Sequence, residues 1–259
     1  MISANRGIAV PLLVTLGLVV SVGLAATPDS RSANAAESPV GLGNAGSFAV
    51  LAASTVTNTG ATMVSGDLGV NAGSAVTGFP PGIVSNGAVH NTDALSGQAQ
   101  HDLVTAYNDA AGRTPTASGL GALDGKTLVS GVYAGGALTL DGTLTLSGSA
   151  TDVFIFQATS TLDAGQSSHV LFTGGASACN VFWQVASSAT LETGSDFAGT
   201  IMALKSVSAN TGARITGRLL ARTGGVTMQT NTITRPTSCV TSAVGTPATP
   251  VPGRARFTG

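Results

Sequence analysis

Short stretches that alternate apolar and small polar residues recur along the second half of the chain. Four of them align without gaps: STLDAG at 160–165, ATLETG at 189–194, VSANTG at 207–212 and VTMQTN at 226–231. Their starting points are 29, 18 and 19 residues apart. Alternation of this kind is typical of β-strands, and strand repeats of about 20 residues indicate a solenoid whose coils stack on one another. A β-sandwich is the alternative for the same pattern.

The repeats also predict which side chains face outward, because successive residues of a strand point to opposite faces. The predicted inward residues are Leu162, Leu191, Ala209 and Met228. The predicted outward residues form a column of hydroxyls, namely Thr161, Thr190, Ser208 and Thr227. We therefore expect one flat, hydroxyl-rich face on the solenoid.

A second column is expected one step around the turn. It contains Thr193, Thr211 and Thr230. These threonines adjoin Gly194, Gly212 and Asn231, residue types that accept the positive φ of a sharp corner. The strands that follow place Asp196, Arg214 and Arg218 outward, which predicts that the next face is an ordinary charged surface.

Residues 92–111 interrupt the strand pattern with helical spacing. The apolar positions are Leu95, Ala99, Leu103, Ala106, Tyr107 and Ala110. Asn91 or Thr92 can cap this segment, and Asp93 suits the positive end of the helix dipole. A single amphipathic helix beside a solenoid most simply covers one apolar face of it.

The two ends of the chain differ from its middle. Residues 1–35 combine Arg6, an apolar stretch and the small-residue site Ala33-Asn34-Ala35, which is the layout of a secretory signal peptide. Residues 36–240 are predicted to form the folded domain, and 241–259, rich in Pro, Thr and Gly, a flexible tail. We expect a secreted, extracellular protein that is free of the membrane once the leader is cleaved.

The composition excludes several classes of partner. Only 9% of the residues are charged, against about 25% in an ordinary domain, and the formal net charge is -1. Such a surface has no field to attract nucleic acid or anionic lipid. In an oxidising compartment the two cysteines, Cys179 and Cys239, favour one disulfide, and two unpaired buried thiols are the alternative.

Motifs that could indicate a cofactor site or a catalytic site lack the neighbouring elements that such a site requires. The glycines of GLGNAG at 41–46 match a dinucleotide pattern, but no strand precedes them. His90, His101 and His169 share no ligand spacing for a metal. The acids are scattered and no G-x-S-x-G sequence occurs, so a polysaccharide lyase on a β-helix is the weaker, enzymatic alternative. We expect no cofactor, no metal and no enzyme activity.

Several stretches in the same order carry a family resemblance. They are LGNAGSFAVLAASTVTNTGATMVSGDLGV, GFPPG, AYNDAAGRTPT, GVYAGGALTLDGTLTLSG, VFIFQATSTL, CNVFWQVASSATLETGSDFAGTIMALKSV and ITGRLLARTGGVTMQTNTIT. Together they resemble the ice-binding protein family of cold-adapted microorganisms, over essentially all of residues 41–239. The resemblance implies a mainly β fold, a right-handed, discontinuous β-solenoid of triangular section with one long α-helix packed alongside.

The resemblance also implies a function. A flat face would bind an ice crystal surface through ordered threonines, inhibiting ice growth or recrystallisation, in a protein that we expect to be a monomer. Active relatives often carry Thr-Ala/Gly-x-Thr/Asn on this face, and the full form occurs here once, as Thr59-Gly60-Ala61-Thr62. The equivalent corners at 193–196 and 211–214 end in charged residues instead. A cell-surface or matrix adhesin that uses the same solenoid as a scaffold without ice activity is the alternative function.

Overall fold

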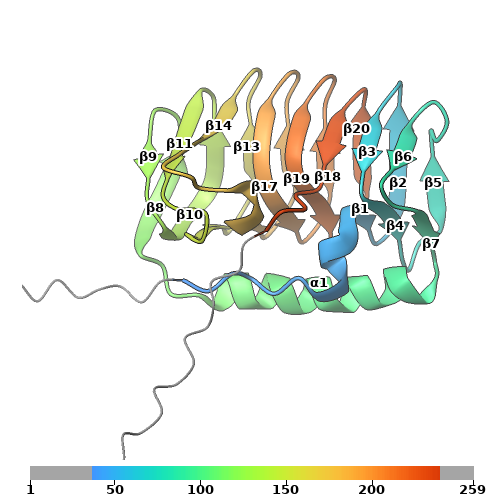
Figure 1. Ribbon diagram of the computed structural model, residues 1–259, viewed down its shortest axis with the longest axis horizontal. Helices are drawn as coiled ribbons and strands as arrows, with labels where there is room; N and C mark the ends of the chain where they lie inside the picture. The colour runs from blue at the N-terminus through green and yellow to red at the C-terminus, as the bar shows by residue number, and fades with distance from the viewer. Residues whose placement is uncertain (1–36, 240–259) are drawn as a thin grey trace, which may run out of the picture. The chain divides into compact units, whose positions relative to one another are not determined.

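The computed structural model describes residues 37–239, so the predicted leader (1–35) and the predicted tail (241–259) lie outside the described residues. Within that range, 21 strands form one sheet in which the recorded strand pairs are parallel, and this sheet winds as a solenoid (Figure 1). One long helix, α1 (Ala94–Gly112), runs alongside, together with two short 3-10 helices, η1 (Gly43–Ser47) and η2 (Ala178–Asn180). The predicted mainly β solenoid with one accompanying helix is confirmed.

The strands stack in three faces. The helix face, which lies next to α1, contains β8 (Ala117–Ala122), the first half of β10 (Gly131–Leu140), β12 (Phe154–Ala158), β15 (Val181–Val185), the second halves of β17 (Asp196–Ala203) and β19 (Arg214–Ala221), β1 (Phe48–Ala52), β4 (Asp67–Val70) and β7 (Val89–Asn91). The hydroxyl face contains the second half of β10, β13 (Leu162–Ala164), β16 (Ala189–Leu191), β18 (Val207–Ala209), β20 (Val226–Gln229), β2 (Thr55–Thr59) and β5 (Ala75–Thr77). The mixed face contains β9 (Thr127–Leu128), β11 (Thr143–Ser147), β14 (His169–Thr173), the first halves of β17 and β19, β21 (Thr232–Thr234), β3 (Met63–Ser65) and β6 (Ile83–Ser85).

The coils do not stack in chain order. The first coil pairs with the last one on all three faces, through β1 with β19, β2 with β20 and β3 with β21. After β7 the chain returns along the whole stack as α1 and begins again at the opposite end with β8 (Figure 1). This is the discontinuity that the resemblance implied, and it places residues that are far apart in the sequence side by side.

The interior is apolar and tightly filled. All four predicted inward residues, Leu162, Leu191, Ala209 and Met228, are buried, so the predicted inside and outside of these strands are confirmed. An aromatic stack runs through successive coils, with ring centroids 5.6, 3.9 and 5.0 Å apart; its members are Tyr133, Phe156, Trp183 and Phe197. The buried indole N–H of Trp183 donates to the carbonyl of Ala198 at 3.0 Å, so this donor is not left unsatisfied in the core.

Glycine allows two strands to bend from one face to the next. In β17 the residues before Gly199 belong to the mixed face and those after it to the helix face. Gly199 has φ 109°, a backbone conformation that side chains rarely permit. Its neighbour in register is Gly217 of β19, where an added Cβ would collide with the Gly199 carbonyl. The small residues therefore let two coils turn a corner while staying paired.

The helix follows the predicted pattern with a different cap. Of the predicted contact positions, Ala99, Leu103, Ala106, Tyr107 and Ala110 are buried, while Leu95 is partly buried against the same cluster. These side chains pack on outward residues of the helix face, so that face is apolar on both sides. The N-cap is Asp93, which replaces the predicted Asn91 or Thr92; it accepts from the Ser96 N–H at 2.8 Å while Ser96 Oγ accepts from the Asp93 N–H at 3.1 Å.

Polar contacts attach the helix at its C-terminal end and at its middle. Gln157 of β12 donates from Nε2 to the carbonyls of Ala110 and Arg113, each at 2.8 Å, so it caps the last turn. At the middle of the helix, Asp102 accepts hydrogen bonds from the backbone N–H and the side chain of Asn44, which fixes η1 to the helix. The direction of α1 along the coils is thus set by hydrogen bonds as well as by packing.

The cap gives a pH-dependent prediction. Hydrogen bonds from the Ser96 N–H and then from His90 lower the pKa of Asp93 to about 2. Because the carboxylate is the stabilised form, its contribution is present above the ordinary pKa of about 3.9 and is lost as the pH falls toward 2. We expect Asp93→Ala to lower Tm by about 2–4 °C at pH 7, and the gap to wild type to narrow between about pH 4 and pH 2.

Thermal unfolding followed by circular dichroism over that pH range measures this effect. Asp93→Asn is the matched control, since an amide oxygen also caps a helix, and it should keep most of the stability at pH 7. A gap between Asp93→Ala and wild type that stayed constant down to pH 2 would contradict the role of the carboxylate.

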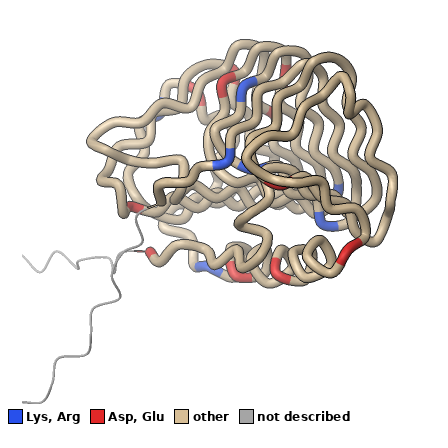
Figure 2. The backbone as a smooth tube through the Cα atoms, turned by 45° about the vertical axis from the view of Figure 1, so that its right-hand side comes forward, with Lys and Arg blue, Asp and Glu red and all other residues tan. Residues whose placement is uncertain are grey.

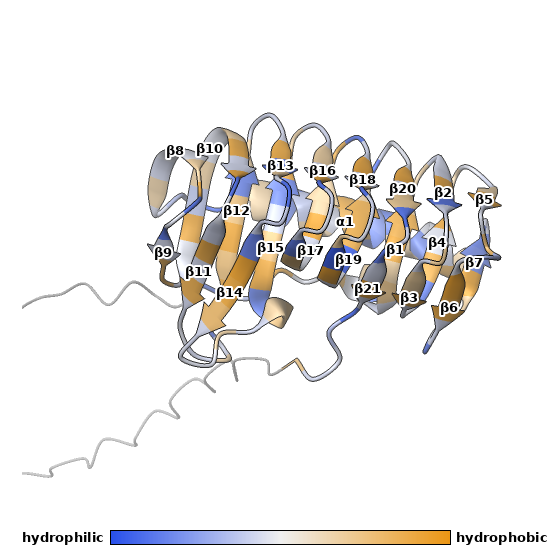
Figure 3. Cartoon of the chain, turned by 90° about the horizontal axis from the view of Figure 1, so that it is seen from above, coloured by the Kyte–Doolittle hydropathy of each residue, from blue (hydrophilic) through white to orange (hydrophobic). Residues whose placement is uncertain are grey.

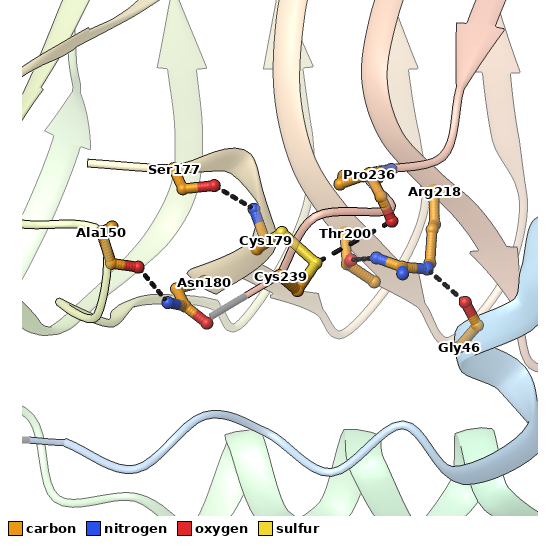
Figure 4. The surroundings of a disulfide bond; sticks show 9 residues. All are labelled: Gly46, Ala150, Ser177, Cys179, Asn180, Thr200, Arg218, Pro236 and Cys239. Carbon is orange, nitrogen blue, oxygen red and sulfur yellow. Dashed lines mark hydrogen bonds between the residues drawn. A yellow bond between two sulfur atoms is a disulfide. The ribbon is translucent and has the colours of Figure 1, made fainter. Parts of the chain in front are cut away.

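The two cysteines form the predicted disulfide. Cys179 of η2 and Cys239, at the end of the described chain, are bonded, with their Cα atoms 5.3 Å apart (Figure 4). The bond ties the segment after β21 to the coil that begins at β15.

One of the three charged residues that were predicted to face outward is a correction to the sequence analysis. Arg218 is buried, whereas Asp196 and Arg214 are exposed as predicted.

Candidate functional site

A straight column of outward residues crosses the whole hydroxyl face. Seven coils contribute one residue each, and strand register places them side by side. In spatial order they are Thr139, Asp163, Thr190, Ser208, Thr227, Thr57 and Thr77. Six carry a hydroxyl. The strands β13, β16, β18, β20, β2 and β5 that hold most of them lie in one row in Figure 3.

The predicted neighbours Thr190, Ser208 and Thr227 are confirmed, but Thr161 is not in their column. Leu162 pairs with Ala189, so Asp163 stands beside Thr190 and Thr161 lies one outward position earlier. The predicted alignment was wrong by two residues. A shift of two keeps every side chain on its own side of the strand, so the alternating pattern could not detect it. Thr161 is still exposed.

Polar residues flank the central column on both sides. Outward positions just before it include Thr161, Ser188, Ser206 and Thr55, and positions just after it include Glu192, Asn210, Gln229 and Thr59. Some are linked between coils: Asn210 Nδ2 donates to Glu192 Oε2 at 2.7 Å, and Thr211 Oγ1 donates to Gln229 Oε1 at 3.1 Å. The face is therefore an ordered array three residues wide.

The corner beside this array is only partly as predicted. Thr193 and Thr211 are exposed there, just before Gly194 (φ 70°) and Gly212 (φ 73°). Thr230 is one step further on, because the backbone bonds of the corner align it with Gly212 and with Gly60. It adopts φ 50° itself, so it occupies a glycine position and does not continue the column of Thr193 and Thr211.

The Thr59-Gly60-Ala61-Thr62 sequence is split between surface and interior. Thr59 is exposed at the end of β2, in register with Gln229. Thr62 is fully buried, and its Oγ1 accepts from the Asn231 N–H at 3.0 Å. The prediction that Thr62 lies on the binding surface is wrong, because its hydroxyl satisfies a buried backbone donor instead.

Charge is confined to one end of the hydroxyl face. Asp141, Asp163 and Glu192 lie together on the coils near β13, and burial, then the charges of Glu192 and Asp141, raise the pKa of Asp163. From Ser208 to Thr77 the central column carries no charged residue. Figure 2 shows how sparse the charges are over the coils as a whole. The two ends of the face thus differ in how strongly they are hydrated.

Besides Asp163, three threonines of the column were missed by the sequence analysis. Thr57 and Thr77 come from the N-terminal coils, which reach this face only because β2 pairs with β20. Thr139 lies on the coil before β13. The alternating stretches TVTNT and ALTLDG carried the signal for Thr57 and Thr139, but their place in the stack could not be read from chain order.

The arrangement is suited to holding water in a lattice. Neighbouring coils repeat at about 4.7–4.9 Å, and alternate residues of a strand at about 6.6–6.8 Å, which makes a two-dimensional grid. Threonine has a stiff χ1, a hydroxyl that bonds water and a methyl that limits other hydration. Within residues 37–239 no group of three or more His, Cys, Asp or Glu is arranged for a metal ion, and no helix has the length and apolar character needed to cross a membrane.

Comparison with known proteins gives a consistent result. Residues 50–234 match the ice-binding-like family. A protein named ice-binding protein from Nostoc sp. (strain HG1) is 47% identical over 74% of this chain and 72% of its own, and one from Colwellia sp. is 38% identical over 76% and 84%. The crystal structure of an ice-binding protein from an Antarctic biological consortium superposes with TM-score 0.75 at 44% identity, covering 77% of this chain and 92% of that one. That from Antarctomyces psychrotrophicus gives 0.74 at 42%, covering 77% and 100%. The chain therefore belongs to the ice-binding-like family.

Proposed function

We propose that this protein adsorbs to ice through its hydroxyl face and thereby inhibits ice growth or recrystallisation. The observation that carries the proposal is the column from Thr190 through Ser208, Thr227 and Thr57 to Thr77, five adjacent coils in register with no charge among them. Relatives that are named ice-binding proteins, and that are similar to this chain over most of their length, support the same function. The ice-contacting set includes Thr59 and the exposed corner residues Thr193 and Thr211.

The mixed face is the other candidate surface, and it is less suitable. One of its columns carries the charged Asp196 and Arg214 and, beyond Thr232, the apolar Met63 and Ile83, which are 56% and 58% exposed. Its threonines Thr216 and Thr234 line a hollow next to the disulfide-tied segment. A charged and uneven surface gives ice fewer simultaneous contacts than an even grid, which favours the hydroxyl face.

The proposal includes the setting in which the protein acts. We infer a secreted monomer that needs no cofactor and catalyses no reaction. The signal-peptide layout of residues 1–35 supports export, and N-terminal sequencing of protein recovered from the culture medium tests it. A mature chain that begins near residue 36 is expected.

Direct observation of ice tests the function. A single ice crystal grown in the purified mature protein is expected to be shaped and held within a measurable gap between melting and freezing. Ice recrystallisation in a frozen protein solution should slow at the same time. A crystal that grows as in buffer, with unchanged recrystallisation, would reject ice binding and leave the passive adhesin scaffold as the better description.

A further inference from the structure

Two arginines near the disulfide have no acidic partner among the described residues. Arg218 of β19 is 5% exposed, and its guanidinium donates from Nε to the Gly46 carbonyl at 3.0 Å and from Nη1 to Thr200 Oγ1 at 3.2 Å (Figure 4). Both acceptors are neutral. Burial, and then the nearby charge of Arg235, lower the pKa of Arg218 to about 10. A buried cation in this position is costly unless an anion accompanies it.

Arg235 lies at the edge of the same region, and its side chain makes no hydrogen bond within residues 37–239. Its backbone N–H donates to the Ser65 carbonyl at 3.0 Å, but Nε is buried and meets no acceptor within residues 37–239. No ion pair involves it in that part of the chain. Residues 240–259 contain no Asp or Glu that could supply the missing charge.

Arg235 is one of the residues that line a hollow of about 410 Å³. Five hydroxyl residues share its lining: Ser177, Thr216, Thr234, Thr237 and Ser238. The Cys179–Cys239 disulfide joins the two walls, since Cys179 and its neighbours line one side and Pro236 to Ser238 the other. Apolar residues such as Phe172, Ala176 and Pro236 line the rest of the hollow. A guanidinium and hydroxyl donors are groups that can bind a tetrahedral oxyanion.

We propose that this hollow binds a small inorganic oxyanion of the phosphate or sulfate type, held by the Arg235 guanidinium and the surrounding hydroxyls, with Arg218 as a second positive charge behind them. The bound anion would neutralise two cations that the fold leaves uncompensated. It would also join the segment after β21 to the coils. The site is separate from the hydroxyl face, so it does not depend on ice binding.

Thermal unfolding in the presence of inorganic phosphate tests the site. The Tm of the disulfide-bonded wild type is expected to rise as sodium phosphate replaces sodium chloride at constant ionic strength, and calorimetric titration should give a saturable isotherm with one anion per chain. Arg235→Gln should raise the Kd for phosphate at least tenfold. Arg235→Lys keeps the positive charge but lacks the planar, bidentate guanidinium, so its Kd should lie between those of the wild type and Arg235→Gln. Sodium sulfate in a parallel series distinguishes a general oxyanion site from one specific for phosphate.

Arg214→Gln is the matched control, because Arg214 is an exposed arginine of the same strand as Arg218 and does not line the hollow. It should bind phosphate like the wild type. Phosphate and sulfate also stabilise proteins by exclusion from their surfaces, and that effect raises Tm equally in every variant. An equal rise in wild type, Arg235→Gln and Arg214→Gln, or no saturable binding to the wild type, would overturn the proposal.

Discussion

Thr227→Tyr is expected to remove most of the thermal hysteresis while leaving the fold intact. Thr227 lies in the middle of the uncharged part of the central column, between Ser208 and Thr57. A tyrosine there would stand above the plane and hold ice away from residues on both neighbouring coils as well. Because the side chain is exposed and makes no hydrogen bond within residues 37–239, the free energy of unfolding should change by no more than about 0.5 kcal/mol.

Thr232→Tyr provides the control on the same coil. Thr232 is an exposed strand threonine five positions along, but it lies on the mixed face, in register with Arg214 and Met63. The thermal hysteresis of Thr232→Tyr should stay near that of the wild type, and Thr227→Tyr and Thr232→Tyr should have the same Tm. Loss of hysteresis in Thr232→Tyr alone would move the ice-binding site to the mixed face. Equal loss of hysteresis in both variants would refute the assignment to a single face.

The second large effect concerns stability. Leu191→Asp is expected to lower the free energy of unfolding by more than about 4 kcal/mol, or to prevent folding, because the carboxylate would lie unpaired in the solenoid interior. Leu191 is fully buried, between Ala164 and Ala209 of the adjacent coils. Urea unfolding followed by circular dichroism measures the change.

Ser208→Asp introduces the same charge on an outward position of the next coil. Ser208 is partly exposed between Thr190 and Thr227, so the carboxylate stays hydrated and stability should remain within about 0.5 kcal/mol of the wild type. If Leu191→Asp and Ser208→Asp unfolded at the same urea concentration, the assignment of inward and outward residues would be wrong.

Much of this fold is encoded locally. Strict alternation in short repeats predicted strands stacked in coils, and it assigned Leu162, Leu191, Ala209 and Met228 correctly to the interior. The change to helical spacing located α1 to within a residue or two, and the presence of only two cysteines left a single possible intramolecular disulfide. These features follow from one strand, one helix or one pair of residues, and they need no knowledge of how distant segments pack.

The composition of the candidate site required tertiary structure. Thr57 and Thr77 join the column because the first coil stacks on the last one, a contact between strands separated by most of the chain. The position of Asp163 in place of Thr161 depends on how the longer coil between β13 and β16 closes, and an alternation with period two does not change under a shift of two. Alternation within one strand therefore determined which side chains face outward, whereas the pairing of distant coils decided which of them are neighbours.

Burial of individual polar residues was likewise decided by packing. Thr62 belongs to a motif that suggested a surface position, yet its hydroxyl serves the Asn231 N–H inside the corner. Thr230 takes a left-handed conformation that adjacent coils assign to Gly60 and Gly212, and Arg218 lies under η1 despite its charge. Alternation and helical spacing were enough to predict stacked strands, the helix and the inward residues Leu162, Leu191, Ala209 and Met228, and the two cysteines favoured one disulfide. The register between coils and the burial of polar residues such as Thr62 and Arg218 could be read only from the folded chain, because both depend on contacts that form when distant segments meet.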